Sequence, residues 1–436
     1  MISGQMITLT VLVAVVAALI WDRVRSDVVA LTGAAVLLMT GVVRPVEVQG
    51  AFASPAIIAL ASLFVIAYAM ELSGLLDASI RRLVALYRWI GRSGLWVVIG
   101  LAGAASAFLN NTPIVVLGAP VVRETAKSLN LSPRRFLMPL SYAAVLGGCC
   151  TLIGTSTNLL VNDMAAVAGQ PRFSIFEITP VGLIVALTGG LYLLLVSGRL
   201  ISTEGGEEPS AEDLRGGREP GLAGGQMGDA SAFAGQVALK PVKAVVSLLI
   251  FIAVVALAAM NVAPIAACAF AGAVLLILLR IITADEAYRG LRPDVLMLIA
   301  GMVVLGIALD VSGVANAATG AMIGSLDTFS PLLALIVIYG VTLFATELLS
   351  NATVAVLFTP IAVSLAEALQ VSPRPFLVAI MIAGSAAFAT PFGYQTNVIV
   401  YQMGRYSYLD FVKVGLPLNF LTWAAAVFAI TIYFPF

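Results

Sequence analysis

The sequence lacks histidine altogether and has few charged residues, and each scarcity excludes a class of protein. Without histidine, the chain has no access to the commonest proton shuttle and metal ligand, which argues against a Ser-His-Asp hydrolase and a haem protein. Only 11% of the 436 residues are charged and 61% are hydrophobic, whereas soluble proteins carry about 25% charged residues. A soluble chain could not bury so much apolar surface, so the sequence predicts an integral membrane protein.

The sequence also has few cysteines and no nucleotide-binding P-loop. The three cysteines, Cys149, Cys150 and Cys268, all lie in apolar runs, so neither a disulfide framework nor a zinc site is expected. Basic and acidic residues both number 23, and this balance does not point to nucleic acid. The sequence contains no P-loop motif, which argues against an ATP-driven pump. We expect a transport protein rather than an enzyme, without an organic cofactor.

Long apolar runs predict an all-α polytopic membrane protein, because a helix needs about 20 apolar residues to cross a bilayer core. The predicted crossings, two of them broken, are 4–21, 27–43, 55–74, 135–168, 174–197, 242–260, 262–282, 293–311, 375–404 and 413–434. Two further apolar stretches, 94–128 and 329–369, are interrupted midway by polar residues, and we interpret each as a re-entrant hairpin of two half-helices.

The two sets of runs are repeats of one another. When 106–140 is placed over 346–380, 12 of 35 positions are identical, including an Asn, a Pro and a Ser-Pro-Arg run. Apolar composition alone would not keep these residues in register across a whole half. Three units follow from this: a first transmembrane repeat at 1–200, a linker at 201–240 that is rich in glycine and acidic residues and predicted to be disordered, and a second transmembrane repeat at 241–436.

Each repeat has an odd number of crossings, so the two repeats are predicted to insert with opposite orientation. With the N-terminus outside, all of the 23 basic residues except Arg44, Arg172 and Arg374 fall on the cytoplasmic side, as the positive-inside rule requires. The linker is then cytoplasmic, and the protein is expected in the plasma or inner membrane. Inverted repeats with hairpins and broken helices are typical of secondary transporters, which bind their cargo near the midplane.

Polar residues gather at the two hairpin tips. The first tip holds Ser106, Asn110, Asn111 and Thr112 before Pro113, and we expect Asn111 and Thr112 at the cap of a half-helix whose free N–H groups could hold an anion. The side-chain oxygens of Ser106 and Asn110, four residues apart, suit a monovalent cation. The second tip repeats the pattern with Thr346, Ser350, Asn351, Ala352 and Thr353.

Polar residues also interrupt two crossing helices. The breaks read Gly154-Thr155-Ser156-Thr157-Asn158 and Gly393-Tyr394-Gln395-Thr396-Asn397. Glycine permits the break, and non-helical backbone is tolerated at this depth only where it lines a buried or wet cavity. Glu347 is the one carboxylate well inside an apolar stretch, and it has either a structural role or that of a proton carrier. Arg134 and Arg374 are expected to extend to the membrane interface.

These tips and breaks resemble the divalent-anion:sodium symporter family of the ion-transporter superfamily, which has a citrate-transporter-like domain. The resemblance covers both repeats and implies a homodimer that carries sulfate or a di- or tricarboxylate with Na⁺ by an elevator motion. It also implies one Na⁺ site at Ser106, Asn110, Asn111 and the Gly154 carbonyl, and another at Thr346, Asn351 and the carbonyls of Leu349 and Gly393. The anion would sit between the tips, at Asn110, Asn111, Thr112, Thr157, Asn158, Ser350, Asn351, Ala352, Thr353, Thr396 and Asn397.

Two alternatives stay open. A transporter of the same fold could exchange Na⁺ for H⁺ or export a metalloid oxyanion, and Glu347 is the only carboxylate available in the core for proton exchange. A gated channel is less favoured, because a channel needs a continuous polar lining while these polar residues converge on one patch at the midplane.

Overall fold

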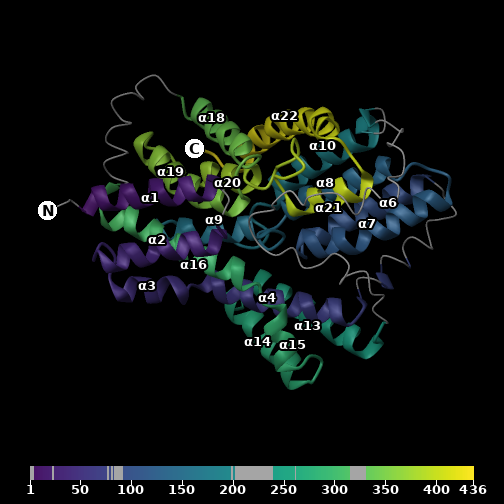
Figure 1. Ribbon diagram of the computed structural model, residues 1–436, viewed down its shortest axis with the longest axis horizontal. Coiled ribbons are helices and arrows are strands. Elements are labelled where there is room, and N and C mark those ends of the chain that lie inside the picture. Colours follow the sequence, from purple (N-terminus) through teal and green to yellow (C-terminus); the bar gives the residue numbers. More distant parts are fainter. Residues whose placement is uncertain are drawn as a thin grey trace, which may run out of the picture.

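The computed structural model describes residues 4–21, 24–75, 78–79, 82, 92–197, 200–201, 239–260, 262–314 and 330–436. Every regular element within these ranges is a helix, which confirms the predicted all-α class (Figure 1). Almost all of the predicted linker at 201–240 lies outside the described residues.

The helices of the first half begin close to the predicted bounds. Several starts have clear local causes: Ser54 accepts a hydrogen bond from the Ile57 N–H, and proline occupies the first turn of α3, α4 and α10, where its missing N–H costs nothing. The bounds are α1 (Gly4–Trp21), α2 (Ser26–Met39), α3 (Pro45–Phe52), α4 (Pro55–Leu72), α6 (Arg92–Ser106), α7 (Asn111–Ser128), α8 (Arg134–Gly148), α9 (Ser156–Val167) and α10 (Thr179–Tyr192), which a π-helical turn η2 (Leu193–Ser197) extends.

The second half has the same order of elements. It consists of α13 (Pro241–Ala259), α14 (Ile265–Leu278), α15 (Ala284–Gly290), α16 (Pro293–Val311), α18 (Pro331–Ala345), α19 (Asn351–Ala368), α20 (Arg374–Ala383), α21 (Gln395–Gly404) and α22 (Tyr408–Tyr433). The starts of α6 and α18, and of α9 and α21, are 239 residues apart, and those of α7 and α19 are 240 apart. The short helices α3 and α15 also correspond, and the sequence interpretation missed both.

The helices form two groups that each draw on both halves of the chain. The first group consists of α1–α4 and α13–α16, and the second group consists of α6–α10 and α18–α22. In the first group α2 packs against α16 and α4 packs against α14 (Figure 1). In the second group α8 contacts α21, α9 contacts α19 and α10 contacts α22. Where the two groups meet, α9 contacts α4 and α16, and α19 contacts α16.

Within the described residues, six helical stretches are long and apolar enough to cross a membrane, and shorter apolar helices accompany them. The six are Pro45–Leu72, Thr179–Val196, Pro241–Ala259, Pro293–Val311, Asn351–Ala368 and Tyr408–Tyr433. The stretch Asn351–Ala368 is α19, which the sequence predicts to be one arm of a re-entrant hairpin. The re-entrant course and the opposite orientation of the two halves stay predictions.

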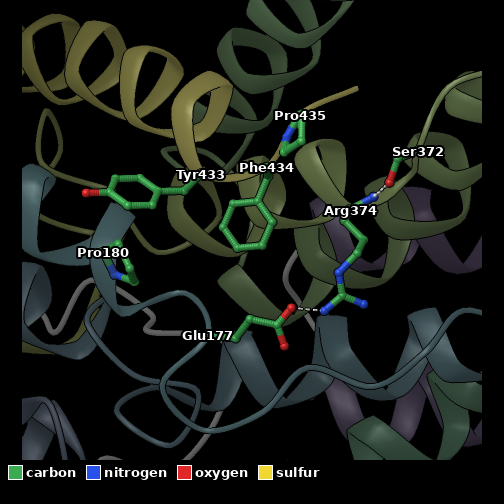
Figure 2. A pocket seen from close by; sticks show the side chains of 7 residues that line it. All are labelled: Glu177, Pro180, Ser372, Arg374, Tyr433, Phe434 and Pro435. Carbon is green, nitrogen blue, oxygen red and sulfur yellow. Dashed lines mark hydrogen bonds and ion pairs between the residues drawn. The ribbon is translucent and has the colours of Figure 1, made fainter.

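Two ion pairs join the halves inside the second group, and the expectation that both arginines extend to the interface is wrong. Arg134, at the start of α8, binds Asp410 of α22 at 2.6 Å and lies over the Tyr406 ring. Arg374, at the start of α20, binds Glu177 ahead of α10 and lies 4.1 Å above the Phe173 ring. Figure 2 shows the Arg374–Glu177 pair beside a cavity of about 400 Å³ that is also lined by Ser372 and Phe434. Each arginine is retained because a carboxylate of the other half satisfies it.

Candidate functional site

The first hairpin tip joins α6 to α7. Asn110, rather than Asn111, is the cap of α7, and its side-chain oxygen accepts from the Thr112 N–H at 3.2 Å. Pro113 is therefore the third helical residue, not the first, which the helix tolerates because its first four N–H groups lack intrahelical partners anyway. Ser106 does not pair with Asn110 but donates to Asn111 Oδ1 at 2.5 Å. Both Ser106 and Asn111 are at most 1% exposed.

The second tip, between α18 and α19, has the same arrangement. Thr346 donates from its hydroxyl to Asn351 Oδ1 at 2.9 Å, as Ser106 does to Asn111. Ser350 caps α19 and accepts from the Thr353 N–H at 3.2 Å. Each tip therefore places a hydroxyl and an amide oxygen within 3 Å of each other, close enough for one cation to contact both.

The two helix breaks also share a bonding pattern. The Asn158 amide donates to the Thr151 carbonyl at 2.9 Å, and the Asn397 amide donates to the Thr390 carbonyl at 3.2 Å. The hydroxyls of Thr151 and Thr390 in turn donate to backbone carbonyls of the hairpin tips, at Ala107 and Glu347. Each break is thus tied to the tip of its own half. The two asparagines do not cap the half-helices, and only Thr155 caps one, by accepting from the Thr157 N–H at 3.4 Å.

Contacts between the halves bring the tips and breaks together. Thr112 of the first tip lies 3.4 Å from Gln395 of the second break, through their side-chain oxygens. Thr346 of the second tip donates to the Gly384 carbonyl at 2.9 Å, and a Cβ on Gly384 would lie 3.4 Å from Thr157 of the first break. Both tips and both breaks therefore border one region of the second group.

The predicted cation ligands divide into those that the structure places close together and those with other partners. Gly154 lies against the first tip, since a Cβ there would be 2.9 Å from the Ala107 carbonyl, and Gly393 lies equally close to Thr390 and Glu347. The side-chain oxygen of Asn110 instead caps α7. Among the described residues, the hydrogen bond seen for Leu349 runs from its backbone N–H to the Ala345 carbonyl. Ala352 lies in the first turn of α19, so only its backbone N–H remains for a ligand.

Several buried oxygens of the second group have no hydrogen-bond partner among the described residues, and one of them lies at the first break. Asn397 Oδ1 accepts from the Ser141 hydroxyl at 2.7 Å, and the same hydroxyl lies 2.8 Å from that of Thr396, which can donate to it. Asn158 Oδ1 has no such partner although the residue is fully buried. The reason is local: the residue that corresponds to Ser141 in the second half is Met381. An unpaired buried amide oxygen is costly, and a cation would satisfy it.

Glu347 serves as an anchor for the second break. Its carboxylate accepts from the backbone N–H groups of Ala389 and Thr390 at 2.7 and 2.9 Å, from the Thr390 hydroxyl at 2.8 Å and from the Asn419 amide at 2.7 Å. Three of the partners are N–H groups, which only donate, and the fourth is a hydroxyl, so the set matches an ionised carboxylate. A proton on Oε1 would face two N–H donors, so this geometry favours the structural role over the proton carrier.

The sequence interpretation gave no role to four residues that complete the site: Ser141, Thr151, Thr390 and Tyr394. The two threonines carried a signal, because they align with each other in the repeat. Ser141 carried none, since its counterpart is apolar. Tyr394 stood inside a predicted break, but nothing in the spacing indicated that its side chain reaches the other half.

These features are those of a multi-pass membrane protein with a cluster of polar residues at the two tips and the two helix breaks. The chain belongs to the family described as Citrate transporter (CitMHS), whose model matches residues 16–371 and 348–436. The family and its relatives indicate a transporter, not an enzyme.

Individual comparisons agree with this family. An uncharacterized transporter of Synechocystis sp. is 24% identical over 98% of this chain and 97% of its own length. Sodium/sulfate cotransporter 1 of Chlamydomonas reinhardtii is 41% identical over 116 residues, which is 25% of this chain and 13% of that protein. The crystal structure of the YdaH transporter of Alcanivorax borkumensis has the same fold, with a TM-score of 0.63 at 13% identity over 88% of this chain and 87% of that one.

Proposed function

We propose that this protein is a Na⁺-coupled symporter of a small divalent anion, sulfate or a di- or tricarboxylate. The observation that carries the proposal is the hydroxyl–amide oxygen pair at each tip, Ser106 with Asn111 and Thr346 with Asn351. Each pair offers hard oxygen ligands to Na⁺, while the N–H groups at the start of α7 and α19 offer donors to an anion. The partial match to the sodium/sulfate cotransporters supports both the cation and the anion.

In this proposal the anion lies between the two tips and one Na⁺ lies at each. The Thr151 and Thr390 hydroxyls hold the breaks against the tips, so the carbonyls near Gly154 and Gly393 reach the cations. Because the cations and the anion share Asn111 and Asn351, each ion increases the affinity for the other. Such reciprocity is the physical basis of coupled symport.

Reconstituted protein tests the proposal directly. Proteoliposomes should accumulate labelled sulfate, succinate or citrate when a Na⁺ gradient points inward, and protein-free liposomes should not. Accumulation that follows a proton gradient and ignores Na⁺, or that moves none of the three anions, would contradict the proposal. Proton exchange is the less favoured reading because Glu347 is already saturated with donors.

Movement of the second group against the first is the transport step that the contacts between the groups support. Asp163 of α9 is 1% exposed and accepts from the Ser54 hydroxyl, at the start of α4, at 2.9 Å. In the other half the corresponding start of α16 is capped by Arg292, which pairs with Asp294 instead. Among the described residues, the groups are thus joined by this polar contact on one side of the pseudo-twofold and by no equivalent bond from the start of α16 on the other, as expected for one end-state of an elevator.

A short bis-thiol crosslinker between cysteines at positions 54 and 163 should therefore abolish uptake. The matched control joins positions 15 and 33 of the first group, where a Cβ on Gly33 would lie 2.6 Å from Val15, and it should leave uptake intact. Each single cysteine variant is the second control. Full uptake by the crosslinked Ser54–Asp163 pair would exclude a motion between the two groups.

The proposal also covers the membrane in which the protein lies, the side of that membrane on which the linker lies, and the oligomeric state. We place the protein in the plasma or inner membrane with 201–240 on the cytoplasmic side, because this orientation puts most basic residues inside. A homodimer is proposed on the family resemblance.

A further inference from the structure

Tyr394 breaks the symmetry between the two halves at the centre of the site. Its counterpart 239 residues earlier is Thr155, whose hydroxyl caps α9. Tyr394 occupies the same cap position of α21 but makes no side-chain cap bond. Its phenol crosses to the first half instead.

The phenol oxygen of Tyr394 meets two of the polar motifs of the first half. Asn111 of the first tip donates its amide to this oxygen at 2.8 Å, and Thr155 of the first break lies 3.4 Å from it. Beside it, Thr112 and Gln395 make a second contact between the same tip and the same break, at 3.4 Å. A single side chain of the second half therefore spans the space that the first tip and first break border.

Hydrogen-bond accounting shows what this phenol can offer to a ligand. Asn111 uses its oxygen to accept from Ser106 and one amide hydrogen to donate to Tyr394. The phenol accepts that hydrogen and retains its own. Among the described residues its one further hydrogen-bond contact is Thr155, at 3.4 Å, which is longer than an ordinary O–H···O bond. The hydrogen of the phenol can therefore turn to an anion. A donor of this kind suits any oxyanion with no hydrogen of its own, sulfate or an ionised carboxylate, so the hydrogen contributes to binding and does not select between them.

Selection between these anions would come from the ring. A di- or tricarboxylate carries charged groups at both ends of a carbon chain, so it needs two separated sets of donors with open space between them. The Tyr394 side chain bridges the first tip and the first break, so it occupies part of the space between them. A compact tetrahedral dianion needs only one set of donors.

We propose that Tyr394 is the specificity-determining residue of this transporter: its hydroxyl contributes to binding of a compact tetrahedral oxyanion, and its ring excludes di- and tricarboxylates. This inference rests on the proposed anion symport and narrows its cargo to the sulfate class.

Two substitutions separate the hydroxyl from the ring. Tyr394→Phe removes the donor and keeps the ring, so the apparent KM for sulfate should rise roughly tenfold while succinate and citrate still fail to compete. Tyr394→Ser restores a small hydroxyl residue like that of the first half and removes the ring, so unlabelled succinate should become a competitor of labelled sulfate. Tyr401→Phe, on the same helix and packed against Phe392 and Phe411, is the control and should change neither quantity.

Transport by the wild-type protein distinguishes a failure of the proposed role of Tyr394 from a failure of the proposed anion symport. If it transports succinate or citrate as well as sulfate, or if Tyr394→Ser still excludes succinate and Tyr394→Phe keeps the wild-type KM, the role of Tyr394 is wrong while anion symport stands. If it moves none of these anions with Na⁺, the proposed function itself fails and the inference falls with it. Elution of both variants as monodisperse, thermally stable protein excludes misfolding as the cause of a change.

Discussion

Replacing Asn111 or Asn351 by alanine should reduce Na⁺-driven anion uptake at subsaturating Na⁺ and anion by at least tenfold. Each amide accepts from the hydroxyl of its own tip and is proposed to contact Na⁺ and the anion together. Its removal withdraws a ligand from the cation. It also leaves the Ser106 hydroxyl without its acceptor, or leaves the Thr346 hydroxyl with the Gly384 carbonyl alone. A buried group that loses its partner costs about 1–3 kcal/mol, and this loss affects both coupled ions.

The two variants should show the same kind of defect, a raised apparent constant for Na⁺ and for the anion, because the two tips repeat one arrangement. Initial rates measured over a grid of Na⁺ and anion concentrations test this. Gln402→Ala removes an exposed amide on α21 and should behave like the wild type. A result in which both asparagine variants keep more than half of the wild-type rate at limiting Na⁺ would remove the tips from the proposed site.

Local signals in the sequence were sufficient to predict most of the fold. The run 293–311 coincides with α16 because a proline starts the helix and a long apolar run follows it. Both breaks and both hairpin tips were placed from glycine and asparagine in register. The cap of α7 was predicted one residue late, because the proline was assumed to occupy the first helical position. Asn110 is itself a strong capping residue, and it determines where the helix begins.

Contacts between the halves could not be predicted from spacing. Glu347 and Asn419 are 72 residues apart, and Asn111 and Tyr394 are 283 apart, so neither pair appears in a local pattern. The same limit explains the error over Arg134 and Arg374. A lone arginine near a helix start is expected to reach water, and only the fold reveals that Asp410 and Glu177 of the opposite half lie within reach. The candidate site is thus local in its motifs and long-range in its connections.

Replacing Glu347 by glutamine should lower the thermal stability of the protein. The carboxylate accepts four hydrogen bonds, two at each oxygen. A glutamine retains one oxygen and presents an NH₂ group to the other two donors. Two buried donors then lose their acceptor, at about 1–3 kcal/mol each.

The uptake of the folded fraction of Glu347→Gln decides between the two roles of the residue. If Glu347 anchors the break, uptake per folded molecule should still depend on Na⁺ and vary little between pH 6 and pH 8, because no proton is carried. Glu367→Gln, an exposed site on α19, is the matched control and should keep both stability and uptake. Asn419→Ala removes one of the four donors but keeps the carboxylate, so it gives a milder variant if the glutamine protein does not fold. A Glu347→Gln protein that is as stable as the wild type but has lost uptake, together with wild-type uptake that follows a proton gradient, would make Glu347 the coupling group and replace Na⁺ symport by proton coupling.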